Sequence, residues 1–205
     1  MKHNARHTTG NVLLLYITAA CIFIVGLWSY LDKSFFLIDY VVAFAFMSWL
    51  FYYARRHALP LYVVASIGLG VIIHLLGAGG LYSKFILGPL GYDKFVHFFG
   101  GFAACFLVLH MISEKNKFTK CIVAVLIVLG LGALMEINEF VGYRYFHQDY
   151  GGIFAIGDNL PEIKSDLQRY DTYFDMIFNV AGGLIAAVTY TVILQQNSHA
   201  RSLRS

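Results

Sequence analysis

The sequence predicts an all-α integral membrane protein, a helical bundle of about six transmembrane helices. Hydrophobic residues make up 59% of the 205 residues and charged residues only 13%, whereas roughly a quarter of residues are charged in soluble domains. Several apolar runs reach about 20 residues, enough for a helix that rises about 1.5 Å per residue to cross the hydrocarbon layer. Aromatic residues, at 17%, gather near the ends of these runs, as they do at membrane interfaces.

Six apolar runs, separated by polar segments, define the expected helices of a single membrane domain over residues 1–205. These spans are residues 11–31, 35–53, 61–82, 92–112, 121–142 and 172–194. Pro60 precedes the third span, at a position where the start of a helix tolerates proline. Residues 83–91 are apolar and contain glycine and proline, a composition that fits either an interfacial or a re-entrant segment. A longer polar segment, residues 143–170, separates the last two spans.

The distribution of Lys and Arg predicts how the helices are oriented. Six spans place both termini on one side, and nine of the 15 Lys and Arg residues lie in segments on that side. Because cytoplasmic segments are enriched in Lys and Arg, we expect both termini in the cytoplasm. The net charge of +3 is spread over several loops and does not indicate a nucleic-acid surface. The 3 cysteines lie in or beside apolar runs and are interpreted as small hydrophobic residues.

Three of the expected helices carry acidic, imidazole or amide side chains near the membrane face opposite the termini. The candidate site residues are Asp93, His97, Glu136, Glu139, Asp171, Asp175 and Asn179. Within each helix they are three or four residues apart, so they share one face, which glycines continue. A carboxylate that faces lipid at mid-helix would cost roughly 2.5–3.5 kcal/mol. We therefore expect a polar pocket in the outer half of the bundle, partly covered by residues 143–170.

Three motifs follow one another in the helices that carry these residues. They are Asp93-Lys94-Phe95-Val96-His97-Phe98, then Glu136-Ile137-Asn138-Glu139-Phe140, then Asp171-Thr172-Tyr173-Phe174-Asp175-Met176. At these motifs the chain resembles the VanZ-like and YjdF-like bacterial inner-membrane proteins, over about residues 90–185. The resemblance implies a multi-span protein of the cell inner (plasma) membrane. Some VanZ-like proteins are linked to resistance to glycopeptide antibiotics, but the resemblance carries no biochemical activity to this chain.

An enzyme is the first hypothesis for the pocket. His97, Glu136 and Asp175 are expected to come within one metal-sized or water-sized site. His97 and the acids around it could bind a divalent metal ion that activates water; these acids are Asp93, Glu136, Glu139, Asp171 and Asp175. Several carboxylates with one histidine suit Mg²⁺, Mn²⁺ or iron better than a structural zinc site. The substrate would be a lipid-linked small molecule or a cell-envelope component, whose phosphate or carboxylate Lys94 and Arg169 could hold. Without a metal, His97 could act as a general base and Glu136 as a general acid.

Two other hypotheses stay open for a chain surrounded by membrane lipid. A proton-coupled transporter or binding protein would use the acids and the histidine as a relay, and a homo-oligomer would supply further helices. In a structural membrane protein without catalysis, the residues would form ion pairs such as His97 with Glu136 or Lys94 with Asp171. Asp93 and Asp171 would then stabilise helix N-termini, and Lys94 would anchor the chain at the membrane interface.

Overall fold

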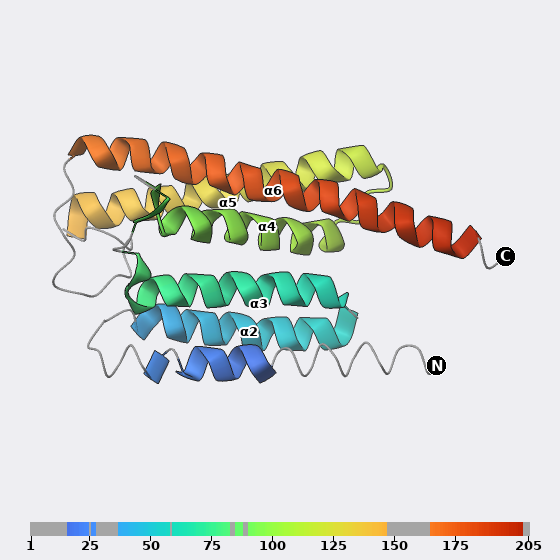
Figure 1. The fold of residues 1–205 in the computed structure, drawn as a ribbon, viewed down its shortest axis with the longest axis horizontal. Helices are drawn as coiled ribbons and strands as arrows, with labels where there is room; N and C mark the ends of the chain where they lie inside the picture. Colours follow the sequence, from blue (N-terminus) through green and yellow to red (C-terminus); the bar gives the residue numbers. More distant parts are fainter. Residues whose placement is uncertain are drawn as a thin grey trace.

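The protein is a bundle of long helices that lie side by side, with one short hairpin (Figure 1). The structure, a computed structural model, describes residues 16–24, 26–27, 37–57, 59–82, 85–87, 90–146 and 165–202. The elements are α2 (Leu37–His57), α3 (Leu61–Leu76), η1 (Gly77–Leu81), β1 (Phe85–Leu87), β2 (Leu90–Gly91), α4 (Asp93–Met111), α5 (Lys117–Phe146) and α6 (Ser165–Ser202). The segments 16–24 and 26–27, ahead of α2, are also helical.

Within the described part of the chain, four helices are long and apolar enough to cross a membrane. They are Leu61–Leu81, Asp93–Met111, Lys117–Gly142 and Tyr170–Ile193, and they match the last four predicted spans. α2 adds a shorter apolar stretch, Tyr40–Ala54, at the second predicted span. Only part of the first predicted span is described, and that part is helical. The predicted all-α membrane bundle is therefore confirmed.

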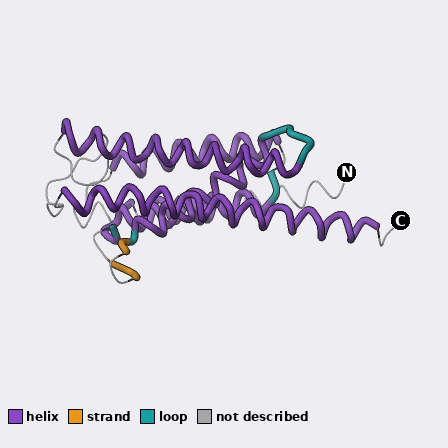
Figure 2. The backbone as a smooth tube through the Cα atoms, turned by 90° about the horizontal axis from the view of Figure 1, so that it is seen from above, coloured by secondary structure: helices purple, strands orange, loops and turns teal. Residues whose placement is uncertain are grey.

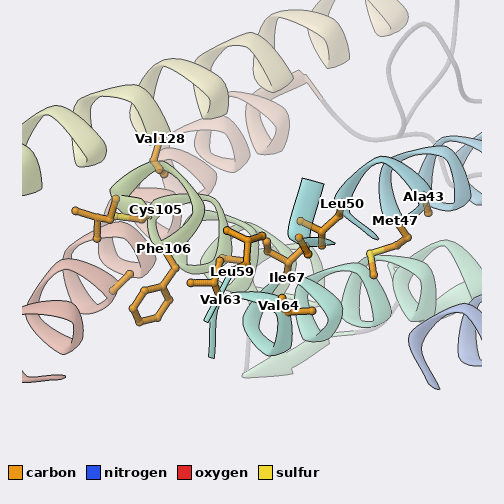
Figure 3. Close-up of a cluster of buried hydrophobic side chains, with 14 of the residues drawn as sticks. Ala43, Met47, Leu50, Leu59, Val63, Val64, Ile67, Cys105, Phe106 and Val128 are labelled. Atoms are coloured by element: carbon orange, nitrogen blue, oxygen red, sulfur yellow. The ribbon is translucent and has the colours of Figure 1, made fainter. Parts of the chain in front are cut away.

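A hydrophobic core joins α2, α3 and α4 (Figure 3). Leu50, Val63 and Cys105, one from each of these helices, are fully buried. Large apolar side chains elsewhere stay exposed on the outer faces of the helices, among them Phe44 and Ile137. This distribution suits a bundle in lipid, because lipid tails are as apolar as leucine and tight packing, not transfer from water, then favours the inward contacts.

The closest helix contact joins α4 to α6 and depends on glycine. A Cβ built on Gly101 of α4 would lie 2.5 Å from the backbone oxygen of Asn179 in α6. A Cβ built on Gly182 of α6 would overlap the backbone oxygen of Phe98 in α4. Small residues on both helices thus let the two backbones touch, as is common between transmembrane helices.

The fifth predicted span begins four residues too late. α5 starts at Lys117 instead of residue 121, because Asn116 caps its first turn. The Asn116 Oδ1 accepts hydrogen bonds from the backbone N–H groups of Phe118, at 3.0 Å, and Thr119, at 3.1 Å. These bonds satisfy donors that have no partner inside the helix, so the charged residues here form a helical turn.

The helix that carries the sixth predicted span extends beyond it, because α6 begins at Ser165, seven residues before residue 172. Its first turns are polar, and hydropathy marks only the apolar part of a helix. Asp171 consequently lies in the second turn, and the prediction that it stabilises a helix N-terminus is wrong. Residues 147–164, the greater part of the predicted covering segment, lie outside the described residues.

The third predicted span ends in an irregular turn. The α-helix stops at Leu76, and η1 continues as a π-helical turn in which Gly80 has φ 113°, a conformation that favours glycine. The ring of Tyr82 packs against Gly77 so closely that a Cβ there would lie 2.6 Å from Tyr82 Cζ. The glycine-rich end of this helix therefore brings an aromatic residue back against the helix itself.

Residues 83–91, predicted from their composition to be an interfacial or re-entrant segment, contain a short hairpin. β1 and β2 pair antiparallel, with Phe85 opposite Gly91 and Leu87 opposite Leu90. Figure 2 shows the hairpin projecting from the end of the bundle at which α4 begins. The hairpin therefore leads the chain from α3 into the first turn of α4.

Substitution of Gly182 by alanine should destabilise the bundle. The new Cβ would overlap Phe98 of α4 and lie 2.9 Å from the backbone nitrogen of Phe102, so the two helices must separate. We expect a loss of about 1–3 kcal/mol, as for other overpacked positions, seen as a lower Tm in detergent. Gly183→Ala is the matched control, since its nearest atom is 3.6 Å away. Equal Tm values for the two variants would contradict the close α4–α6 contact.

Candidate functional site

The polar residues of three helices meet at one end of the bundle. α4 begins at this end, α5 finishes there and α6 begins there, so residues far apart in the sequence lie at the same depth (Figure 1). Within the described chain, ion pairs or hydrogen bonds connect six of the seven candidate residues, the exception being Glu139. Glu139 follows Glu136 by one helical turn, is half-buried and forms none of these contacts.

Lys94 is the central cation of this end of the bundle. Its side chain is 4% exposed, although the sequence favours an anchor at the membrane interface, and that prediction is wrong. The Nζ atom lies 2.5 Å from Asp93 Oδ2 and 2.8 Å from Asp175 Oδ1, and it also contacts Asp171. Three carboxylates can hold the ammonium below the surface because they compensate its lost hydration. The side chain of Arg169, the other predicted anion ligand, lies outside the described side chains.

His97, Glu136 and Asp175 form the group that the sequence predicts. His97 Nε2 lies 3.8 Å from Glu136 Oε1 and 3.5 Å from Asp175 Oδ1. One ligand atom from each of the three residues lies within 4.8 Å of the others. The prediction that these side chains come within one metal-sized site is confirmed, and the three residues come from three different helices.

Two carboxylate oxygens of this group are buried, namely Glu136 Oε1 and Asp175 Oδ1. Asp175 Oδ1 forms an ion pair with the Lys94 ammonium at 2.8 Å, whereas Glu136 Oε1 has no hydrogen-bond partner among the described residues. Glu136 is 8% exposed and Asp175 only 1%. Buried polar atoms are nearly always satisfied, so these oxygens indicate a place where a cation or a proton is bound.

Asn179 holds the imidazole of His97 from the opposite side. Asn179 Nδ2 lies 3.0 Å from His97 Nδ1, and in this orientation the amide donates to a nitrogen without a proton. Glycines on two helices leave room for Asn179: Gly101 of α4 faces its backbone, and a Cβ on Gly132 of α5 would lie 2.6 Å from Nδ2. The orientation of His97 therefore depends on the packing of all three helices.

The described part of this end of the bundle holds more acids than bases. Five carboxyl groups lie near one ammonium and one imidazole, and they belong to Asp93, Glu136, Glu139, Asp171 and Asp175. Uncompensated charge is costly in a membrane interior. Protons or a further cation must therefore balance the carboxylates that Lys94 does not neutralise.

Three residues beside the site receive little weight in the sequence interpretation. His74 Nδ1 lies 2.7 Å from the hydroxyl of Tyr82, and the hydroxyl of Tyr92 donates to the backbone oxygen of Ile73 at 2.9 Å. Burial raises the pKa of Tyr92 above its usual range, so this hydroxyl keeps its proton. The contact between His74 and Tyr82 could have been expected from the glycine cluster that starts at Gly77. Such a cluster predicts a helix break after which the chain turns back.

A comparison with protein families places the chain among membrane proteins. The family model described as "Predicted membrane protein (DUF2238)" matches residues 11–196. The chain belongs to this family. No curated protein and no solved structure matches it. The matched range contains every residue of the site, so the polar group lies inside the family domain of this DUF2238 protein.

Substitution of Gly132 by alanine should separate Asn179 from His97. The new methyl group would lie 2.6 Å from Asn179 Nδ2, and the amide would have to move away from the ring. We expect a loss of about 1–3 kcal/mol from the broken buried hydrogen bond, together with a shift of the His97 imidazole ¹⁵N resonances. Gly130→Ala on the same helix is the control, because nothing lies within 4 Å of its Cβ position. Unchanged His97 resonances in Gly132→Ala would contradict this role of Asn179.

Proposed function

We propose that this DUF2238 protein is a membrane enzyme whose divalent metal ion is bound by His97, Glu136 and Asp175. The metal would activate a water molecule toward a lipid-linked or cell-envelope substrate. The observation that carries the proposal is the convergence of one imidazole nitrogen and two buried carboxylate groups within 4.8 Å. One of their oxygens, Glu136 Oε1, has no hydrogen-bond partner, and a purely structural network would satisfy such a buried oxygen.

The separations between the ligand atoms suit a small divalent ion. Adjacent ligands of a six-coordinate ion at about 2.1 Å lie roughly 3 Å apart, and opposite ligands roughly 4 Å apart. The distances of 3.5 Å and 3.8 Å from His97 Nε2 to the two carboxylates lie between these two values, so shifts of about half an ångström would bring the three atoms to octahedral positions. Three protein ligands leave coordination positions for water and for a substrate oxygen.

Asn179 would prepare His97 for this role. A metal bound at Nε2 requires the proton on Nδ1, and a turned Asn179 amide would present its oxygen to accept that proton. The oxygen and nitrogen of an amide are distinguished only by their hydrogen-bond partners. In the metal-free protein the Asn179 amide nitrogen donates to His97 Nδ1 at 3.0 Å. In the metal-bound protein the turned amide would instead accept the Nδ1 proton with its oxygen.

We also propose where the site lies in the membrane and what kind of substrate reaches it. We place the site in the outer half of the cell inner membrane with both termini in the cytoplasm, because Lys and Arg are enriched on the side of the termini. The order of the three motifs supports a relationship to the VanZ-like and YjdF-like bacterial inner-membrane proteins. A substrate with a lipid anchor could reach a site between helices from the bilayer.

Proton-coupled transport is the second candidate. It is favoured by the excess of carboxyl groups over Lys94 and His97, because protons could balance the same charge that a metal would balance. Of the ion pairs expected of a purely structural protein, Lys94 with Asp171 is present. His97 Nε2 lies 3.8 Å from Glu136 Oε1, but the ring is neutral when Asn179 donates to its Nδ1. Neither pair accounts for the remaining acids.

Metal binding separates these candidates. Purified protein should bind one Mn²⁺ per chain, and electron spin-echo measurements should detect a coordinated imidazole nitrogen that is lost in His97→Ala. His110→Ala is the matched control, because His110 lies in the last turn of the same helix. We expect its Mn²⁺ affinity to be unchanged and that of His97→Ala to fall about 10- to 100-fold or more.

A protein that binds no Mn²⁺ would contradict the metal centre. Vesicles should then be tested for proton uptake, and loss of that uptake in Glu136→Gln would establish the transport candidate. If neither metal nor proton flux is detected, and His97→Ala lowers only the Tm, the ion pairs are structural.

A further inference from the structure

We infer that this end of the bundle contains a second cation site, formed by Asp93, Asp171 and Asp175, which the Lys94 ammonium occupies. The inference builds on the proposed metal centre, which shares Asp175. Its consequence is that Lys94 limits the centre to one exchangeable divalent ion. Without the lysine, the same residues would hold two divalent ions of the Mn²⁺ or Mg²⁺ class.

The surroundings of Lys94 are those of a bound cation. An ammonium has three donors, and two of them are used in hydrogen bonds to Asp93 and Asp171. The third carboxylate, Asp175, forms an ion pair with Nζ at 2.8 Å. Three oxygens thus surround one positive charge, as they would surround a bound cation.

The three carboxylates have the spacing of a metal site in their own right. One oxygen from each of Asp93, Asp171 and Asp175 lies within 4.8 Å of the others. Asp175 is buried, at 1% exposure, whereas the side chains of Asp93 and Asp171 are 23% and 31% exposed. The buried Asp175 oxygen would be the inner ligand, and the exposed side leaves room for water ligands, which Mg²⁺ and Mn²⁺ usually retain.

Asp175 connects the two sites. Its Oδ1 lies 2.8 Å from Lys94 Nζ and 3.5 Å from His97 Nε2, so one carboxylate faces both groups. In two-metal centres the ions are about 3.5–4 Å apart, a spacing that a single carboxylate can bridge. Lys94 therefore occupies the position that a second ion takes in such a centre, next to the ion bound by His97 and Glu136.

The test measures metal stoichiometry in Lys94→Met. We expect one Mn²⁺ per chain in the natural protein and two in Lys94→Met, with an exchange-coupled electron paramagnetic resonance spectrum from neighbouring ions. The double variant Lys94→Met with Asp171→Asn is the matched control. It removes one positive and one negative charge together, but it lacks the third carboxylate, so it should return to one Mn²⁺.

Stability provides a second readout, because Lys94→Met leaves three carboxylates without their cation. Its Tm should fall without metal and should recover in Mn²⁺ by more than the natural protein gains. If the natural protein binds one Mn²⁺, a Lys94→Met protein that also binds only one, or that cannot be obtained folded in Mn²⁺, would overturn the inference while leaving the proposed function intact. If the natural protein instead binds no Mn²⁺ and Lys94→Met binds one Mn²⁺, the proposed function is refuted. That result would still support the second site.

Discussion

The ammonium of Lys94, buried among the carboxylates of Asp93, Asp171 and Asp175, is the interaction on which the polar end of the bundle depends. It joins the first turn of α4 to the early turns of α6 across 77 residues of sequence. Loss of Lys94 would leave the buried carboxylate of Asp175 without its cation, which is the costly case for buried ion pairs. The other polar contacts of the site are arranged around this pair of helices.

Close packing and electrostatics support one another here. Gly101 and Gly182 bring the backbones of α4 and α6 into contact, and that contact places Asp175 beside both Lys94 and His97. Gly132 then lets α5 approach Asn179, so Glu136 reaches the same place. Because carboxylates repel one another at this distance, helices bearing them stay together only if the packing is tight and a cation or protons balance their charge.

The sequence predicts much of this site from spacing alone. Residues three or four apart on a helix share a face, and this rule selects the acids of α5 and α6 as well as His97. Spacing does not reveal depth, however. Lys94 sits at the boundary of an apolar run, where lysine usually reaches toward water, and only its partners on α6 explain why it is buried. Likewise, the polar start of α6 at Ser165 gives no hydropathy signal, so Asp171 is mistaken for a residue near the helix end.

The sequence by itself determined the class of the protein and the helices that carry its chemistry, because length, hydropathy and helical periodicity are local properties of the chain. It also determined that α4, α5 and α6 present their polar faces at the same membrane depth. Only the tertiary structure decided which atoms meet. The convergence of His97, Glu136 and Asp175, and the position of the Lys94 ammonium between three carboxylates, depend on helix rotation and on contacts at glycine, which arise only between segments distant in sequence.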